Sequence, residues 1–136
     1  MCMQLYIGVD NELTDASSWL LPWKLNTKYE DDNFADKHLT KKYKYGLMGC
    51  ACNMGFDFSV ERFDEAANID YNEDGKQAIE KLFEYIKTNV EADNCELLSF
   101  WSGEYKMEHN DTIDLKSFIL GDKFEFLEGQ RIVVYK

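Results

Sequence analysis

The sequence predicts an α+β fold in which one long amphipathic helix packs on a mixed or antiparallel sheet of five to six strands. Three observations support this prediction. The 136 residues suit one domain, residues 1–136. Residues 76–90 carry apolar side chains at helical spacing, and several other short segments are rich in β-forming residues. Because the helix can bury its apolar stripe only against a sheet face, a two-layer arrangement follows.

The first half of the chain is expected to contribute three strands. Residues 3–9 are rich in β-forming residues, and residues 23–29 alternate between apolar and polar types. Residues 43–50 form the third predicted strand, in which Gly46 and Gly49 indicate a bulge or a close backbone approach. A short helix is expected over residues 31–38.

The helix over residues 76–90 is the strongest local prediction. Its apolar residues recur at steps of three and four and form one stripe: Ile79, Leu82, Phe83, Ile86 and Val90. Asp74 followed by Gln77 resembles a capping box, so the helix is expected to begin just after Asp74.

The last third of the chain is expected to complete the sheet. Residues 94–101 are nearly apolar on both faces, which predicts a central strand. Residues 108–111 indicate a polar loop, and residues 113–120 a short helix or edge turn. Residues 124–127 and 131–135 flank a glycine-containing turn and predict a closing β-hairpin.

The charge balance excludes several functions. The chain has 26 acidic and 15 basic residues, a formal net charge of −11. Binding to nucleic acid or to an anionic membrane needs clustered basic residues, so neither partner is expected. The segment 57–74 is the most acidic, and it predicts an acidic face around the start of the helix, with Asp64 and Glu65 as candidate contacts for a basic partner. The lysines of residues 37–44 are interpreted as solvated side chains that offset nearby acids.

The cellular compartment expected for the chain determines which chemical state its cysteines are predicted to have. The start of the chain has no secretory pattern, and no run is apolar enough to span a membrane, so a cytoplasmic location is predicted. In a reducing compartment, cysteines are free thiols or metal ligands more often than disulfides. Cys50 and Cys52 would lie on one face of an extended segment and supply half of a zinc site, or else be inert buried thiols.

A second metal pattern lies before the predicted helix. Asp70, Asn72 and Asp74, followed by Gly75, match the opening of a calcium-binding loop. The position of the closing glutamate is occupied by Lys81 instead. The alternative is an Asp- and Asn-rich turn that caps the helix. Any calcium binding is therefore expected to be weak.

Catalytic patterns are not found in the sequence. Nucleophilic catalysis needs a nucleophile held by a base, and the two histidines, His38 and His109, are both interpreted as surface residues. No glycine-rich phosphate loop occurs. Trp19 and Trp23 lie in a predicted loop, where they would either anchor a partner or pin the loop to the core. The chain is thus expected to be non-catalytic, with no cofactor.

Short motifs along the chain resemble a group of uncharacterised small bacterial proteins. The start has Met1-Cys2 followed by Leu5-Tyr6-Ile7, and a later run reads Gly49-Cys50-Ala51-Cys52, then Gly55-Phe56. The group has glycine where this chain has Ala51, and it lacks two residues before Gly55. The resemblance implies no activity, but it implies that Cys2 accompanies the Cys-x-Cys motif. If the first strand lies beside residues 43–50, the three thiols could approach one another.

Two functions follow as expectations. The first is an acidic protein-interaction domain that binds a basic partner, as an immunity protein binds a toxin. The second is a thiol-based metal or redox site at Cys2, Cys50 and Cys52.

Overall fold

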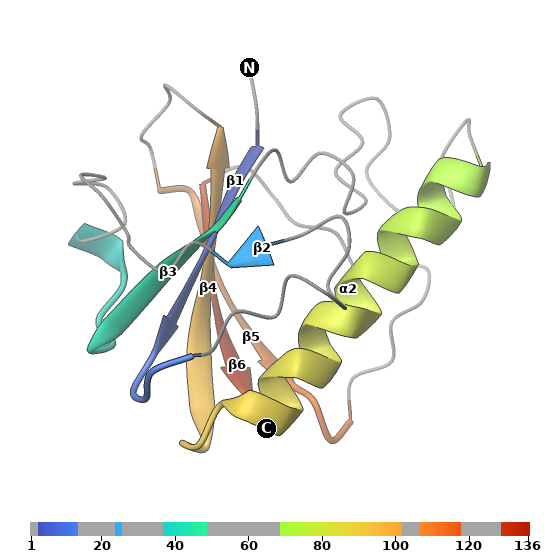
Figure 1. Ribbon diagram of the computed structural model, residues 1–136. Coiled ribbons are helices and arrows are strands. Elements are labelled where there is room, and N and C mark those ends of the chain that lie inside the picture. The colour runs from blue at the N-terminus through green and yellow to red at the C-terminus, as the bar shows by residue number, and fades with distance from the viewer. Residues whose placement is uncertain (1–2, 14–23, 26–36, 49–68, 102–106, 118–128) are drawn as a thin grey trace.

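The computed structural model describes residues 3–13, 24–25, 37–48, 69–101, 107–117 and 129–136 (Figure 1). It confirms the α+β class, because a mixed sheet is covered on one face by a helix. The helix is α2 (Ile69–Asn89). The strands are β1 (Met3–Val9), β2 (Lys24–Leu25), β3 (Tyr43–Met48), β4 (Asn94–Trp101), β5 (His109–Asp114) and β6 (Gln130–Tyr135).

The six strands are arranged in the order β2-β3-β1-β4-β6-β5. β5 and β6 run parallel, and all the other neighbours run antiparallel. β4 lies between β1 and β6, which confirms the predicted central strand. Its buried run, Cys95 to Phe100, has side chains inside on both faces of the sheet. A strand with two paired edges and two covered faces favours apolar residues throughout.

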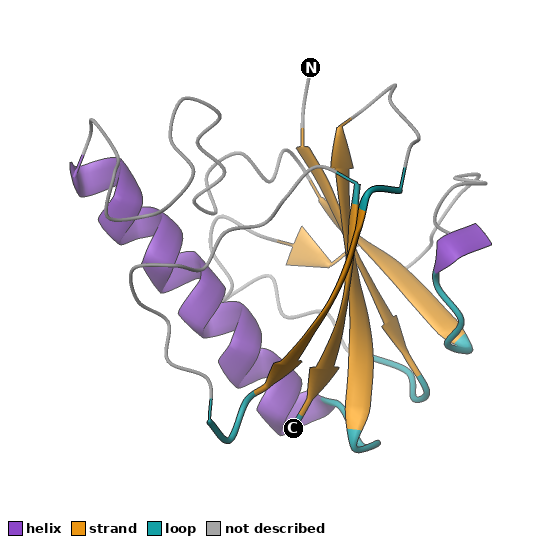
Figure 2. Ribbon diagram, turned by 180° about the vertical axis from the view of Figure 1, so that it is seen from behind, coloured by secondary structure: helices purple, strands orange, loops and turns teal. Residues whose placement is uncertain are grey.

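Helix α2 and one face of the sheet enclose the main core (Figure 2). The predicted apolar stripe is buried, with Ile79 and Ile86 fully inaccessible. The sheet contributes alternate residues of its central strands: Leu5, Ile7, Val9, Cys95, Leu97, Ile132 and Val134. Their spacing of two along each strand is the spacing expected for one face of a sheet.

The helix begins at Ile69, five residues before Asp74, the predicted cap. Asp70, Asn72 and Asp74 therefore lie in its first turns and do not precede it as a loop. Acidic residues are favourable there, because the N-terminal end of a helix carries a partial positive charge. The sequence pattern marked the right region, but it placed the boundary too late.

The opposite face of the sheet has its own smaller cluster. Leu39, Leu98 and Phe100 are buried there, and Tyr6 and Met107 pack against them. The rings of Tyr6 and Phe100 are stacked, with centroids 5.5 Å apart and planes 3° from parallel. A Cβ atom at Gly46 would lie 2.9 Å from Cε1 of Tyr6. The close approach predicted at Gly46 is thus confirmed, with an aromatic ring as the neighbour. Gly49, for which the same prediction was made, lies outside the described residues.

Two predictions for the C-terminal region were wrong. His109 was expected in a polar loop, but it begins β5, whose residues are mostly exposed because it lies at the edge of the sheet. By contrast, the short helix or edge turn expected within residues 113–120 is confirmed as a turn over residues 115–117, where the N–H of Ser117 donates to the carbonyl of Asp114 (3.2 Å). The hairpin partner expected for residues 131–135 is also excluded, because β6 pairs with β4 on one side and β5 on the other along its whole length.

Two predictions for the N-terminal half are only partly covered by the described residues. Within the expected strand 23–29, residues 24–25 form β2. Within the expected helix 31–38, residues 37–38 are helical, and the next residue, Leu39, is buried. The remaining residues of both segments lie outside the described part of the chain.

The loop after β1 closes the C-terminal end of α2. The side-chain amide of Asn11 donates to the carbonyl of Asn89 (3.0 Å), and its side-chain oxygen accepts from the backbone N–H of Glu91 (3.0 Å). These groups would otherwise be left without helical partners. One side chain therefore connects the β1 end of the sheet to the helix.

Replacing Asn11 with alanine is expected to destabilise the protein by about 1–2 kcal/mol, because both capping hydrogen bonds are lost. Urea unfolding followed by circular dichroism measures the effect. Glu12→Gln is the matched control, since Glu12 is the exposed neighbour, and it should change stability by less than about 0.5 kcal/mol. Equal stabilities of the two variants would show that the cap contributes nothing.

Candidate functional site

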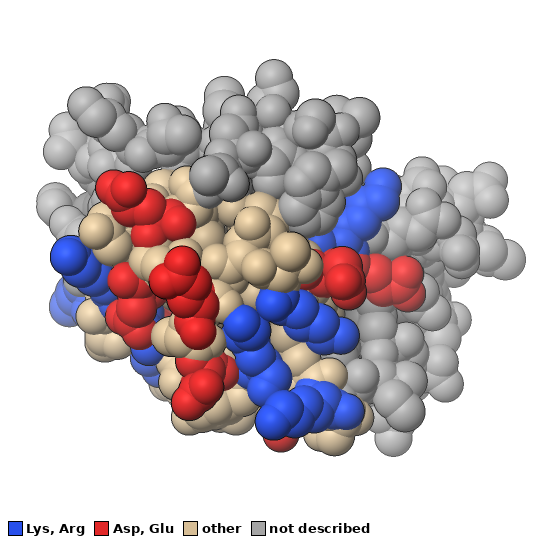
Figure 3. All heavy atoms as spheres, turned by 60° about the horizontal axis from the view of Figure 1, so that its bottom comes forward, with Lys and Arg blue, Asp and Glu red and all other residues tan. Residues whose placement is uncertain are grey.

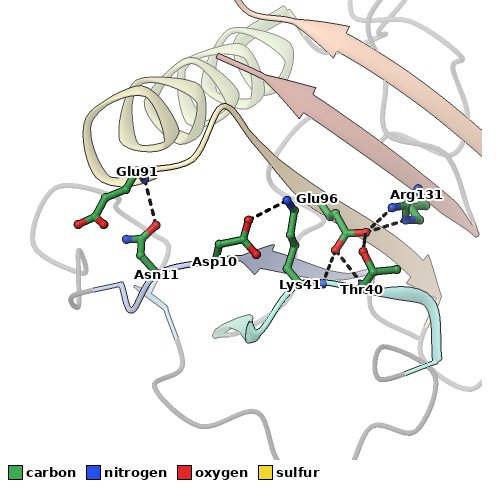
Figure 4. A network of polar contacts seen from close by, with 7 residues as sticks. All are labelled: Asp10, Asn11, Thr40, Lys41, Glu91, Glu96 and Arg131. Atoms are coloured by element: carbon green, nitrogen blue, oxygen red, sulfur yellow. Dashed lines mark hydrogen bonds and ion pairs between the residues drawn. The ribbon is translucent and has the colours of Figure 1, made fainter.

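The most connected polar group of the described residues is the carboxylate of Glu96, on the face of the sheet away from α2 (Figure 4). Glu96 is only 1% exposed. Its Oε1 accepts hydrogen bonds from the backbone N–H groups of Thr40 (2.8 Å) and Lys41 (3.0 Å). Its Oε2 accepts from the Thr40 hydroxyl (3.0 Å) and from Nε of Arg131 (3.0 Å), and it also pairs with the second guanidinium nitrogen.

Three elements bring these groups together. Glu96 lies on β4 opposite Gly8 of β1, and a Cβ atom at Gly8 would come within 3.0 Å of the Glu96 carboxylate. The missing side chain at Gly8 therefore leaves space for Glu96. Arg131 reaches the carboxylate from β6, and residues 40–41 reach it from the chain just before β3.

The arrangement is that of a structural clasp. A buried carboxylate is costly unless it is paired and hydrogen-bonded, and here both oxygens have several donors. With its lone pairs used in this way, Glu96 has no acceptor site open for a substrate proton. The clasp holds the segment before β3 against β4 and β6.

Sequence reasoning missed the Glu96 clasp. One signal was present, because Glu96 is the only charged residue in the apolar strand 94–101. A lone charge in such a strand needs a partner. The partner could not be identified, because Arg131 is 35 residues away along the chain and Thr40 is 56 residues away.

Thr40 and Lys41, which bind the Glu96 carboxylate, belong to the basic stretch 37–44. The sequence predicted that the lysines of this stretch are solvated and offset nearby acids. Lys37 and Lys42 are exposed. Lys41 forms an ion pair with Asp10 (2.9 Å), so it offsets a nearby acid. Burial lowers the pKa of His38 below its ordinary value, and the neighbouring charges of Lys37 and Arg131 add to the effect.

Most residues that the sequence proposed for binding lie outside the described part of the chain: Cys2, Trp19, Trp23, Cys50, Cys52, Asp64 and Glu65. The first turns of α2 include Asp70, Asn72 and Asp74. Within the described residues, no three or more His, Cys, Asp or Glu side chains are grouped so that they could hold a metal ion. The zinc and calcium predictions therefore stay predictions.

Cys95 is the one cysteine that the structure describes, and it is a buried core residue of β4. Burial raises the pKa of its thiol to about 12. Because the thiolate is the reactive form, Cys95 is expected to be inert at neutral pH.

A thiol titration with a disulfide reagent at pH 8 is expected to miss Cys95 in the native protein and to count all four thiols after denaturation. Cys95→Ala should leave the native count unchanged and lower the denatured count by one. A native count that drops by one in this variant would mean that Cys95 is accessible after all.

Comparisons with known proteins gave no relatives. No family model matches the chain, and neither a curated protein nor a solved structure matches it. The resemblance to small bacterial proteins accordingly stays a prediction. Within the described residues, no helix has the length and apolar character that a membrane crossing requires.

Proposed function

We propose that this chain is a non-catalytic acidic domain that binds a basic protein, as an immunity protein binds the toxin it neutralises. The observation that carries this proposal is the amount and placement of acidic charge. The described residues contain 13 acidic and 11 basic residues, a net charge of −2. The remaining residues contain 13 acidic and 4 basic residues, a net charge of −9. Most of the excess negative charge is therefore concentrated outside the described core.

Several exposed acidic residues lie close in sequence or in space to the end of α2. Figure 3, which brings the bottom of Figure 1 forward, shows acidic and basic side chains side by side on that face. We call the exposed residues Glu12, Glu91, Asp93 and Asp114 the acidic end. The two hydrogen bonds of Asn11 bring the loop of Glu12 to Glu91, and the N–H of Lys136 donates to the carbonyl of Asp93 (2.9 Å). Asp114 is opposite Tyr135, the residue before Lys136.

The acidic end is electrostatically unfavourable in the free protein. The C-terminal end of a helix carries a partial negative charge, so acidic residues beside it repel it. Lys87 and Lys116 are also exposed near this end, and the ammonium of Lys136 donates to the carbonyl of Val90, so these three cations offset much of the charge. A basic side chain from a partner would relieve the remaining repulsion, and the long-range field would speed the encounter.

The test is to capture the partner from cells that express the chain, to identify any stoichiometric protein and to measure its association rate at several salt concentrations. The partner is expected to be basic. The association rate should fall at least about tenfold between about 50 mM and 500 mM salt, because exposed charges are screened. An acidic partner, or a rate independent of salt, would contradict the proposal.

Charge variants locate the contact. The double variant Glu91→Gln, Asp93→Asn should slow association at low salt. Glu80→Gln with Glu84→Gln is the control, because both residues are exposed on α2 but precede its C-terminal end. An equal effect of the two sets would mean that only the total charge matters.

A second function, a metal or redox site at Cys2, Cys50 and Cys52, is favoured by one observation. β1 lies beside β3 in antiparallel register, with Tyr6 opposite Gly46. Cys2 precedes Tyr6 by four residues, and Cys50 follows Gly46 by four. The paired residues end at Tyr6 and Gly46, before either strand ends, so the two cysteines follow the same end of this strand pair but lie beyond its paired residues.

Metal analysis of protein purified without a chelator tests the zinc form of this function. We expect close to one equivalent of zinc, lost in Cys2→Ser and Cys50→Ser. Cys95→Ala is the control and should retain the metal, since Cys95 is buried in the core. Less than about 0.2 equivalents of bound metal in the parent protein would reject a zinc site.

A further inference from the structure

We propose that the outer edge of β5 accepts an extended basic segment of the partner, which adds a strand to the sheet. This inference rests on the proposed function and names the surface and the mode of docking. β5 is the last strand in the sheet order, and within the described residues it pairs with β6 alone. Four of its six residues are exposed: Asn110, Asp111, Thr112 and Asp114.

The backbone hydrogen bonds show which groups of β5 face outward. The N–H of His109 donates to the carbonyl of Gly129 (3.0 Å), and the N–H of Leu115, just after β5, donates to the carbonyl of Tyr135 (2.7 Å). In a parallel pair, alternate residues bond to the neighbouring strand. The odd-numbered residues therefore bond to β6, and the N–H and C=O groups of Asn110 and Thr112 and the N–H of Asp114 point away from it, whereas the carbonyl of Asp114 accepts from the N–H of Ser117 (3.2 Å). These groups can pair with an incoming strand.

Charge decides what kind of strand fits. Asp111 and Asp114 are exposed on β5, and Asp111 also accepts a hydrogen bond from the side-chain amide of Gln130 (2.8 Å). A second copy of β5 would place the same aspartates beside them, and like charges on paired strands repel. Asp111 and Asp114 lie on opposite faces of the sheet, because successive side chains of a strand alternate. A segment with lysine or arginine at two positions three residues apart would place an opposite charge beside each of them. Asp114 also belongs to the acidic end, so one basic partner could contact both surfaces.

A synthetic peptide of lysine and valine residues, with lysines three positions apart so that both faces of the strand carry charge, is the first probe. Two-dimensional NMR of the full chain should show shifts centred on residues 109–114 at peptide concentrations below about 1 mM. The amides of Asn110, Thr112 and Asp114 should exchange at least about tenfold more slowly with the peptide bound. A peptide of the same sequence with a methyl group on every backbone nitrogen keeps the charge but has no N–H to donate along either edge, so it should not bind.

Substitutions at Thr112 provide the matched pair of variants. Thr112→Pro removes the outward N–H without removing a hydrogen bond to β6, and proline is tolerated at such edge positions. It should weaken peptide binding at least about tenfold. Thr112→Val keeps the N–H and the branched shape, so it should bind within about twofold of the parent chain. Urea unfolding of both variants checks that the fold is retained.

Several outcomes would overturn the inference. Equal binding of the two peptides, or of the two variants, would mean that charge alone attracts the segment. No binding at about 1 mM would reject the edge as a docking site. Slow exchange of the three amides in the free chain would mean that the edge of β5 is already covered. A solution mass that rises with protein concentration would mean that a second copy of the chain covers this edge. If Thr112→Pro leaves a captured basic partner bound while the acidic-end variant weakens it, the inference fails and the proposed function stands.

Discussion

Replacing Arg131 with methionine is expected to destabilise the protein by about 3 kcal/mol. The substitution removes the only cation paired with Glu96 in the described residues, while the carboxylate stays 1% exposed. Leaving a buried charge without its partner costs about 3–5 kcal/mol. The value expected here lies at the lower end, because Arg131 is itself 25% exposed and Thr40 and Lys41 still donate to the carboxylate.

The double variant Arg131→Met, Glu96→Gln shows whether the cost comes from the unpaired charge. Its loss should be smaller than the sum of the two single losses, since no buried charge is left alone. Urea unfolding measures all three variants, with Lys42→Met as the exposed-cation control. Additive losses would contradict the clasp, because additivity is the behaviour of residues that do not interact.

Replacing Ile86 with alanine is expected to destabilise the protein by about 2–5 kcal/mol. Ile86 is fully buried between α2 and the sheet, and truncation removes apolar contacts and leaves a cavity. Urea unfolding measures the loss, and a drop in the thermal midpoint should accompany it. Lys87→Ala, at the next position of the same helix, is exposed and should change stability by less than about 0.5 kcal/mol.

A loss below about 1 kcal/mol for Ile86→Ala would mean that the helix is not packed on the sheet as described. A comparison with Phe100→Ala separates the two faces of the sheet, because Phe100 belongs to the cluster away from α2. Both variants should unfold in a single transition, since both clusters share β4.

The elements with strong local patterns were predicted well. Ile79, Leu82 and Ile86 recur at helical spacing and are all buried. The apolar run of residues 94–101 forms the central strand. β5 was missed because edge strands carry polar residues on their exposed sides, so its alternation was hidden. The hairpin prediction failed because the turn signal at Gly129 is local, whereas the neighbours of β6 are decided by the whole sheet.

The sequence by itself determined the α+β class, the presence and apolar side of the helix, the central place of β4 and the acidic balance. These properties depend on residues that are neighbours along the chain. The tertiary structure alone decided that Glu96 meets Thr40 and Arg131, that Asn11 caps α2 and that β5 is a parallel edge strand. The physical reason is distance along the chain: a hydrogen bond between residues 35 to 78 positions apart leaves no periodic trace in the sequence.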